Sequence, residues 1–175
     1  QEAIKHFQQS LKISPSDSAY HLQLAKAYLV DQQMDEAFKV FETLTRIDSA
    51  NYEAFYGLGV IWVKRKNREK AIQNLEMAVR LNPGFYKSHK VLGDLFLKSG
   101  AYGRAQKEIE KAIRLHKKDP ILYLMLGEIH FKNNRDADGV KAFKRMTELF
   151  PENFQAQIRL ANWYYQKGSL DESFQ

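Results

Sequence analysis

The feature that most constrains the fold of this chain is a repeat of 34 residues. The stretch NREKAIQNLEMAVRLNP, residues 67–83, is followed 34 residues later by AYGRAQKEIEKAIRLHKKDP, and DEAFKVFETLTRIDS precedes it at about the same interval. Each stretch places apolar residues three or four apart, the spacing of an amphipathic helix. A period of about 20 to 50 residues indicates a stack of similar helical or stranded units.

Aligned at this period, the 175 residues divide without a gap. The expected division is the second helix of a truncated unit at 1–17, full units at 18–51, 52–85, 86–119 and 120–153, and a truncated unit at 154–175. Together they are expected to form one solenoid domain, because a single hairpin cannot bury its apolar stripe until it is stacked on a copy of itself. Since the first residue falls within the pattern, the chain is expected to be part of a longer adaptor or assembly protein.

Each unit contains two helical patterns. The first carries a stripe represented by Phe55, Leu58, Gly59 and Trp62, and its counterparts are His21, Leu24, Ala25 and Tyr28; His89, Leu92, Gly93 and Phe96; Tyr123, Leu126, Gly127 and His130; and Gln157, Leu160, Ala161 and Tyr164. The second carries a small and then a large residue, in the pairs Ala3 and Phe7, Ala37 and Phe41, Ala71 and Leu75, Ala105 and Ile109, and Gly139 and Phe143.

The small residues of the first pattern are the strongest signal. Glycine inside a helix costs about 1 kcal/mol relative to alanine, so its recurrence at Gly59, Gly93 and Gly127 needs a physical reason. A larger side chain at these positions would hold two helices apart. The pattern therefore predicts that these glycines are notches at which neighbouring helices pack closely.

These spacings resemble the tetratricopeptide repeat, whose pattern is an aromatic residue, Leu-Gly, a second aromatic residue, Ala-x3-Phe and a proline over 34 residues. The resemblance covers the whole chain. The departures are Gly139 in place of the second-helix alanine, Ser49 and Lys117 in place of the proline, and Pro120 three residues late. The resemblance implies an all-α fold, a right-handed superhelix of 34-residue helix-turn-helix repeats, with the first helices lining a concave face.

The family register identifies the residues of the first helices that are not used for packing. They are Leu22, Lys26, Leu29, Tyr56, Val60, Val63, Lys90, Asp94, Leu97, Leu124, Glu128, Phe131, Ile158, Asn162 and Tyr165. Because many are apolar, they are expected to form a groove for an extended peptide or an amphipathic helix. The alternative is that they pack against neighbouring repeats. A charge at Phe131 or Tyr56 is expected to weaken partner binding without loss of helicity.

No catalytic centre is expected. Asp94 and Glu128 occupy equivalent places, but an open groove does not provide the burial that separates two carboxyl pKa values, so contacts to Lys90 or to a basic ligand group are expected instead. The five histidines lack metal-ligand spacing, and His21, His89 and His130 are expected to pack in aromatic positions. The chain is expected to be neither an enzyme nor a metal- or cofactor-binding protein. It contains no cysteine and no apolar run long enough to span a bilayer.

The net charge of +6 is concentrated in the middle of the chain. The run KRKNREK, residues 64–70, and further basic residues on second helices and loops could attract an acidic partner. Nucleic-acid binding is the weaker expectation, because no regular base-reading pattern is present. The main expectation is a protein-interaction scaffold, and the alternative is a non-catalytic arm that recruits substrates to a larger enzyme such as a transferase. Exposed stacking faces at the ends of the chain predict end-to-end self-association.

Overall fold

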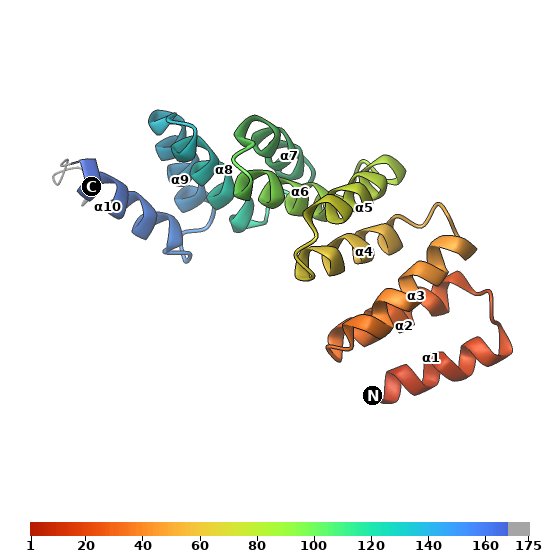
Figure 1. Ribbon diagram of the computed structural model, residues 1–175. Helices are drawn as coiled ribbons and strands as arrows, with labels where there is room; N and C mark the ends of the chain where they lie inside the picture. The colour runs from red at the N-terminus through yellow and green to blue at the C-terminus, as the bar shows by residue number, and fades with distance from the viewer. Residues whose placement is uncertain (168–175) are drawn as a thin grey trace. The chain divides into compact units, whose positions relative to one another are not determined.

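The computed structural model describes residues 1–167, and every regular element in that range is an α-helix (Figure 1). The helices are α1 (Glu2–Ile13), α2 (Ser18–Val30), α3 (Met34–Ile47), α4 (Tyr52–Lys64), α5 (Arg68–Leu81), α6 (Tyr86–Lys98), α7 (Tyr102–Leu115), α8 (Pro120–Lys132), α9 (Asp136–Leu149) and α10 (Gln155–Lys167). None of these helices is both long enough and apolar enough to cross a membrane.

The period of the sequence reappears in the starting points of the helices. The first helices of successive hairpins begin at residues 18, 52, 86 and 120, and the second helices begin at residues 34, 68, 102 and 136. The exception is α10, which begins at Gln155, one residue later than the spacing requires. Residues 168–175 of the expected truncated unit 154–175 lie outside the described residues.

Short polar side chains begin several of the first helices. Asp17 accepts hydrogen bonds from the backbone N–H groups of Ala19 and Tyr20 at 2.9 and 3.1 Å. Asp119 accepts one from Ile121 at 3.0 Å, and Pro120 is the first residue of α8, where its missing N–H is not needed. Pro120 is therefore a helix-starting residue, which explains why it lies three residues late in the repeat pattern.

The turn inside each hairpin has a feature that the sequence reading did not predict. The middle residue of each turn has a left-handed backbone. The φ angles are 60° at Gln32, 59° at Lys66, 76° at Gly100 and 57° at Asn134. These residues are 34 positions apart. Three of the four are not glycine, although a side chain in this conformation costs about 1–2 kcal/mol. The closely packed hairpin therefore imposes the same turn geometry on different residues.

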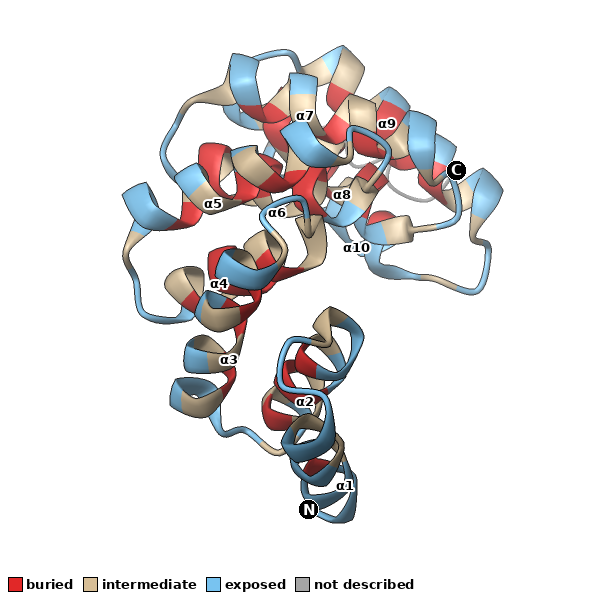
Figure 2. Ribbon diagram, turned by 90° about the vertical axis from the view of Figure 1, so that its right-hand side faces the viewer, coloured by how far each residue is buried: buried red, intermediate tan, exposed pale blue. Residues whose placement is uncertain are grey.

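The helices are organised in two compact units, one covering residues 1–88 and one beginning at His89. In unit 1, each helix from α1 to α5 packs on the next, around buried residues that include Leu24, Phe41 and Leu58. In unit 2, α7 packs on α8, α8 on α9 and α9 on α10. Figure 2 shows buried residues recurring in short bands along the helices, as their amphipathic sequences require.

The glycine notches are present where the sequence predicted them. A Cβ atom added to Gly59 would lie 2.7 Å from Cγ of Leu75, and one added to Gly93 would lie 2.5 Å from Cδ1 of Ile109. At Gly127 it would overlap the ring of Phe143. Each glycine therefore receives a large side chain from the second helix of its own hairpin, which confirms the predicted close packing.

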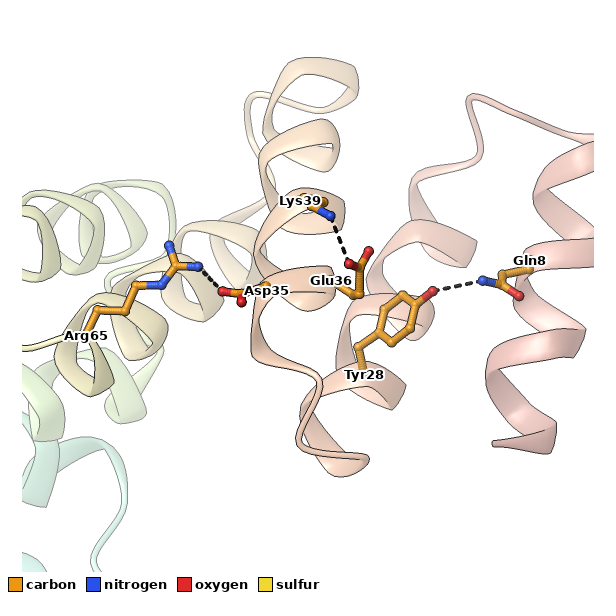
Figure 3. Close-up of polar contacts among 6 residues, drawn as sticks. All are labelled: Gln8, Tyr28, Asp35, Glu36, Lys39 and Arg65. Carbon is orange, nitrogen blue, oxygen red and sulfur yellow. Dashed lines mark hydrogen bonds and ion pairs between the residues drawn. The ribbon is translucent and has the colours of Figure 1, made fainter.

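Polar contacts between helices add to this packing in unit 1 (Figure 3). The Gln8 amide of α1 donates a 2.8 Å hydrogen bond to the Tyr28 hydroxyl of α2. Arg65, in the basic run that follows α4, forms an ion pair of 2.5 Å with Asp35 of α3 and lies 4.3 Å above the Phe38 ring. This part of the basic run is therefore engaged within the protein.

Candidate functional site

The expected groove residues share one property, which is that none of them is buried. Those on α2, α4, α6 and α8 are half-buried, and Ile158, Asn162 and Tyr165 on α10 are exposed. By contrast, most of the expected packing stripe is buried, including Leu24, Leu58 and Leu92. The same helices therefore carry a buried face and a partly accessible one.

Unit 2 contains a cleft of about 860 Å³ on the accessible face. Five of the expected groove residues line it: Asp94, Leu97, Glu128, Phe131 and Asn162. We call this the unit 2 cleft. Its other lining residues are Lys98, Gly100 and Tyr102 at the turn between α6 and α7, Lys132 at the end of α8, Phe143 of α9, and Arg159, Trp163 and Gln166 of α10.

The two acidic residues of the unit 2 cleft are paired with cations of the same unit. Asp94 forms an ion pair of 2.7 Å with Lys98, and Glu128 forms one of 3.1 Å with Arg159 of α10. The expected contact to Lys90 is not formed, because Lys90 pairs with Asp119 at 2.7 Å. Arg159 and Lys98 are more than half exposed, so these cations can exchange partners at little cost.

Aromatic rings form one wall of the unit 2 cleft. The Phe131 ring centroid lies 5.3 Å from that of Phe143 and 5.4 Å from that of Trp163. A Cβ atom at Gly139 would lie 2.8 Å from the Phe131 ring, so the ring occupies the space that a second-helix alanine would take. Phe131 is therefore packed as well as accessible, and a charge there would disturb the fold as well as the cleft.

Sequence reasoning missed the contributions of Gly139 and Trp163. The departure of Gly139 from the repeat pattern was a visible signal, but a pattern does not show which side chain fills the space. Trp163 stands where the three preceding first helices have the buried Ile61, Leu95 and Ile129. A tryptophan at that place predicts packing, and only the fold brings its ring to Phe131.

The expected residues of unit 1 make contacts with their own neighbours. Lys26 forms an ion pair of 2.5 Å with Glu53, and the Tyr56 ring packs edge-on to Phe85 at 5.1 Å. Burial, and secondarily the nearby Tyr86, raises the pKa of the Tyr56 hydroxyl. Leu22 and Leu29 pack against the core of unit 1. In unit 1, these expected groove residues are therefore engaged in contacts within the unit.

The buried histidines of the packing stripe have different surroundings. His21 is within 2.9 Å of the Asp17 carbonyl oxygen, and His89 is within 2.7 Å of a Glu108 carboxylate oxygen. His130 is 6% exposed, and burial is the main cause that lowers its pKa. All three are packed, as predicted. Within residues 1–167, no three histidine or acidic side chains are grouped as a metal site would require.

Comparison with known proteins identifies the repeat. Family models described as tetratricopeptide repeat match residues 1–52, 53–84 and 91–151. No curated protein matches the chain in a sequence search. Solved structures with a similar fold include YrrB, described as a tetratricopeptide repeat protein with an unusual peptide-binding site, with 18% identity, a TM-score of 0.83 and coverage of 98% of this chain and 88% of that one.

Two further solved structures extend the comparison. MamA from Desulfovibrio magneticus RS-1 is 17% identical with a TM-score of 0.80, and the match covers 89% of this chain and 88% of that one. A chain of the APC/C hetero-tetramer Cut9-Hcn1 is 18% identical with a TM-score of 0.74, and the match covers 95% of this chain and 34% of that one. At these identities the likeness establishes the fold alone.

Proposed function

We propose a function on the basis that this chain belongs to the tetratricopeptide repeat family. Repeats of this family are typically non-catalytic interaction modules. On that basis, the unit 2 cleft is the binding site for an extended peptide segment of a partner protein, and the chain serves a larger adaptor or assembly protein.

The observation that carries this proposal is the composition of the unit 2 cleft. It combines an aromatic wall, Phe131 and Trp163, with polar groups of both signs along its length. Its volume of about 860 Å³ lies within the range of about 300–1,000 Å³ that ligand sites occupy. The aromatic wall can bury apolar side chains of a peptide, while a small number of polar groups fix its orientation.

A selection experiment tests the proposal. A random peptide library is selected against the 175-residue chain, and enriched peptides are titrated against the chain and against Asn162→Trp, in which an exposed cleft residue becomes a bulky plug. Lys144→Trp is the control, because Lys144 is exposed on α9 and does not line the cleft. We expect Asn162→Trp to weaken binding about tenfold or more, which corresponds to about 1.4 kcal/mol.

Two results would contradict the proposal. One is a library that yields no peptide above background. The other is a set of peptides that bind Asn162→Trp and the unaltered chain equally well. Circular dichroism on each variant separates a blocked cleft from a lost fold.

We also propose, separately from the peptide site, that the chain self-associates through exposed apolar side chains. Phe154, Ile158 and Tyr165 are 61%, 59% and 72% exposed, and exposed apolar groups of this size favour contacts between molecules. Sedimentation velocity over a range of concentrations should show dimers for the unaltered chain and fewer for Ile158→Lys. A monomer at all concentrations would disprove the proposed self-association.

A further inference from the structure

A second hollow lies in unit 2 among helices α7, α8 and α9, and it shares no lining residue with the unit 2 cleft. Its volume is about 350 Å³ and its walls are mostly apolar. Ile113 of α7, Tyr123 and Leu126 of α8, and Ala142 of α9 form these walls. We call it the α7/α9 slot.

The repeat register explains why the slot opens at this hairpin. Ala142 occupies the position that is Val40, Asn74 and Glu108 in the three preceding second helices, so it is the smallest of the four. Alongside it, Leu126 is only half-buried. Its counterparts in the preceding first helices, Leu24, Leu58 and Leu92, are 5%, 6% and 2% exposed. A smaller side chain on α9 thus uncovers the floor of the slot.

The imidazole of His130 supplies a polar group in the slot wall. It stands where the preceding first helices have Tyr28, Trp62 and Phe96. His130 is 6% exposed, and its Nδ1 is buried without a hydrogen-bond partner within the described residues. Buried polar atoms are nearly always satisfied, so this unpaired nitrogen distinguishes the slot wall from the aromatic packing of the preceding hairpins.

Cations stand on both sides of the opening. Arg114 of α7 and Lys141 of α9 line the slot, are exposed, and have no ion-pair partner within residues 1–167. The third rim cation, Arg145, is paired with Glu148 at 2.8 Å. Two carboxylates also lie at the rim, Asp138 held by Arg135 at 2.6 Å and Glu110 bonded by the Gln106 amide at 2.8 Å.

This arrangement selects among negatively charged partners. A nucleic acid presents closely spaced phosphates and is bound by rows of cations, whereas Arg114 and Lys141 are separated by an apolar hollow. An acidic peptide can place one carboxylate on each unpaired cation and one apolar side chain between them. The small volume suits a single side chain, because it lies near the lower limit of ligand sites.

We propose that the α7/α9 slot is a second docking site, which takes one bulky apolar side chain of an acidic peptide segment while flanking carboxylates pair with Arg114 and Lys141. The slot is separate from the peptide site proposed above, so either site can exist without the other. Apolar burial provides the anchoring contact, and the two cations fix the direction of the segment.

The test uses four fluorescein-labelled peptides with Leu, Ile, Phe or Trp at the centre and two aspartates on each side, titrated into the 175-residue chain by fluorescence anisotropy. Three comparison probes are a peptide with glycine at the centre, one with lysines in place of the aspartates, and a single-stranded oligonucleotide. We expect at least one of the four acidic peptides to bind more tightly than every comparison probe.

Two variants locate the binding site. Arg114→Glu with Lys141→Glu reverses the rim charges, and Ala142→Val introduces the residue of the first hairpin and fills the slot. The control is Lys107→Glu with Lys144→Glu, which makes the same charge change on the same two helices outside the slot. We expect a loss of about tenfold or more for each slot variant and less than about twofold for the control.

Each other outcome overturns the proposal. Absence of binding by all four peptides removes the site, and equal loss in the control variant would mean a diffuse electrostatic attraction. Tighter binding of the oligonucleotide would assign the surface to nucleic acid. If the acidic peptides bind and only Asn162→Trp weakens them, they occupy the unit 2 cleft. Unchanged helicity of Ala142→Val, checked by circular dichroism, shows that its effect is local.

Discussion

The hairpin α4–α5 in unit 1 and the hairpin α8–α9 in unit 2 have the same register but different packing. In the first, Leu75 fills the Gly59 notch, and the second helix carries Ala71 at its small position. In the second, the Phe143 ring fills the Gly127 notch, and the small position is Gly139. In the second hairpin, the notch of the first helix therefore holds a phenylalanine ring in place of a leucine, and glycine in place of alanine makes a second notch on α9.

The glycine on α9 changes the accessible face of unit 2. Gly139 receives the Phe131 ring, which also packs against Phe143 and Trp163 and forms the wall of the unit 2 cleft. In the unit 1 hairpin α4–α5, the same two register positions hold Val63 and Ala71. Exchanges of side-chain size at fixed register positions thus decide where a repeat stack is filled and where it is hollow.

The largest expected effect comes from filling a notch. Gly127→Ala places a methyl group against the Phe143 ring, which is 2% exposed and cannot move freely, so we expect a loss of about 1–3 kcal/mol in unfolding free energy. Gly59→Ala should lose less, because its added Cβ would lie 2.7 Å from the nearest Leu75 atom, which is a smaller overlap than the one at Gly127. Urea denaturation of both variants compares the two hairpins. Gly103→Ala is the control, because nothing lies within 4 Å of its added Cβ, and an equal loss there would contradict the packing explanation.

The second effect concerns the left-handed turn residues. Gly100→Ala in unit 2 should lose about 1 kcal/mol, because alanine is strained at a φ of 76°. Lys66→Gly in unit 1, at a φ of 59°, should relieve that strain and lose less than an ordinary glycine substitution, or gain stability. Melting temperatures measure both changes. A clear loss for Lys66→Gly would show that this turn is not strained.

The third effect is a change in the cleft with little change in stability. Gly139→Ala gains helix propensity worth about 1 kcal/mol but displaces the Phe131 ring, so the two contributions oppose each other. We expect the indole NMR signal of Trp163 to shift while that of Trp62, in unit 1, does not. Gly139→Ala combined with Phe131→Leu, the residue at Leu29 and Leu97, should be more stable than Gly139→Ala alone, because the smaller side chain leaves room for the methyl group. An unmoved Trp163 signal would mean that Gly139 does not position the wall.

The smallest effect is a dependence on pH. Burial lowers the pKa of His130 below its ordinary value of 6.5, with Arg135 acting in the same direction and Asp138 and Glu110 opposing it. The folded state then binds fewer protons than the unfolded state, so stability falls as pH drops below about 6.5. The comparable position in unit 1, Trp62, does not titrate there. Between about pH 7.5 and 5, the melting temperature of His130→Phe should therefore fall less than that of the unaltered chain. An equal fall would exclude His130 as the cause.

Most of the architecture could be predicted because it depends on short-range spacing. Apolar residues three or four apart define each helix, and a glycine that recurs every 34 residues marks each close contact. The register also placed five residues that line the unit 2 cleft on one side of the first helices, for the same reason. The pairing of Asp94 and Glu128 with Lys98 and Arg159 could not, since it depends on which flexible side chains reach the accessible face.

By itself, the sequence determined the repeat, the order of the helices, the glycine notches and the division of each helix into packing and accessible positions, because these follow from local periodicity. Only the tertiary structure decided that Gln32, Lys66 and Asn134 adopt left-handed turns, that Gly139 receives Phe131, and that Ala142 uncovers Leu126. The physical reason is that these features arise from volumes contributed by different helices. A side chain fills or leaves a space only in relation to neighbours that the fold brings to it.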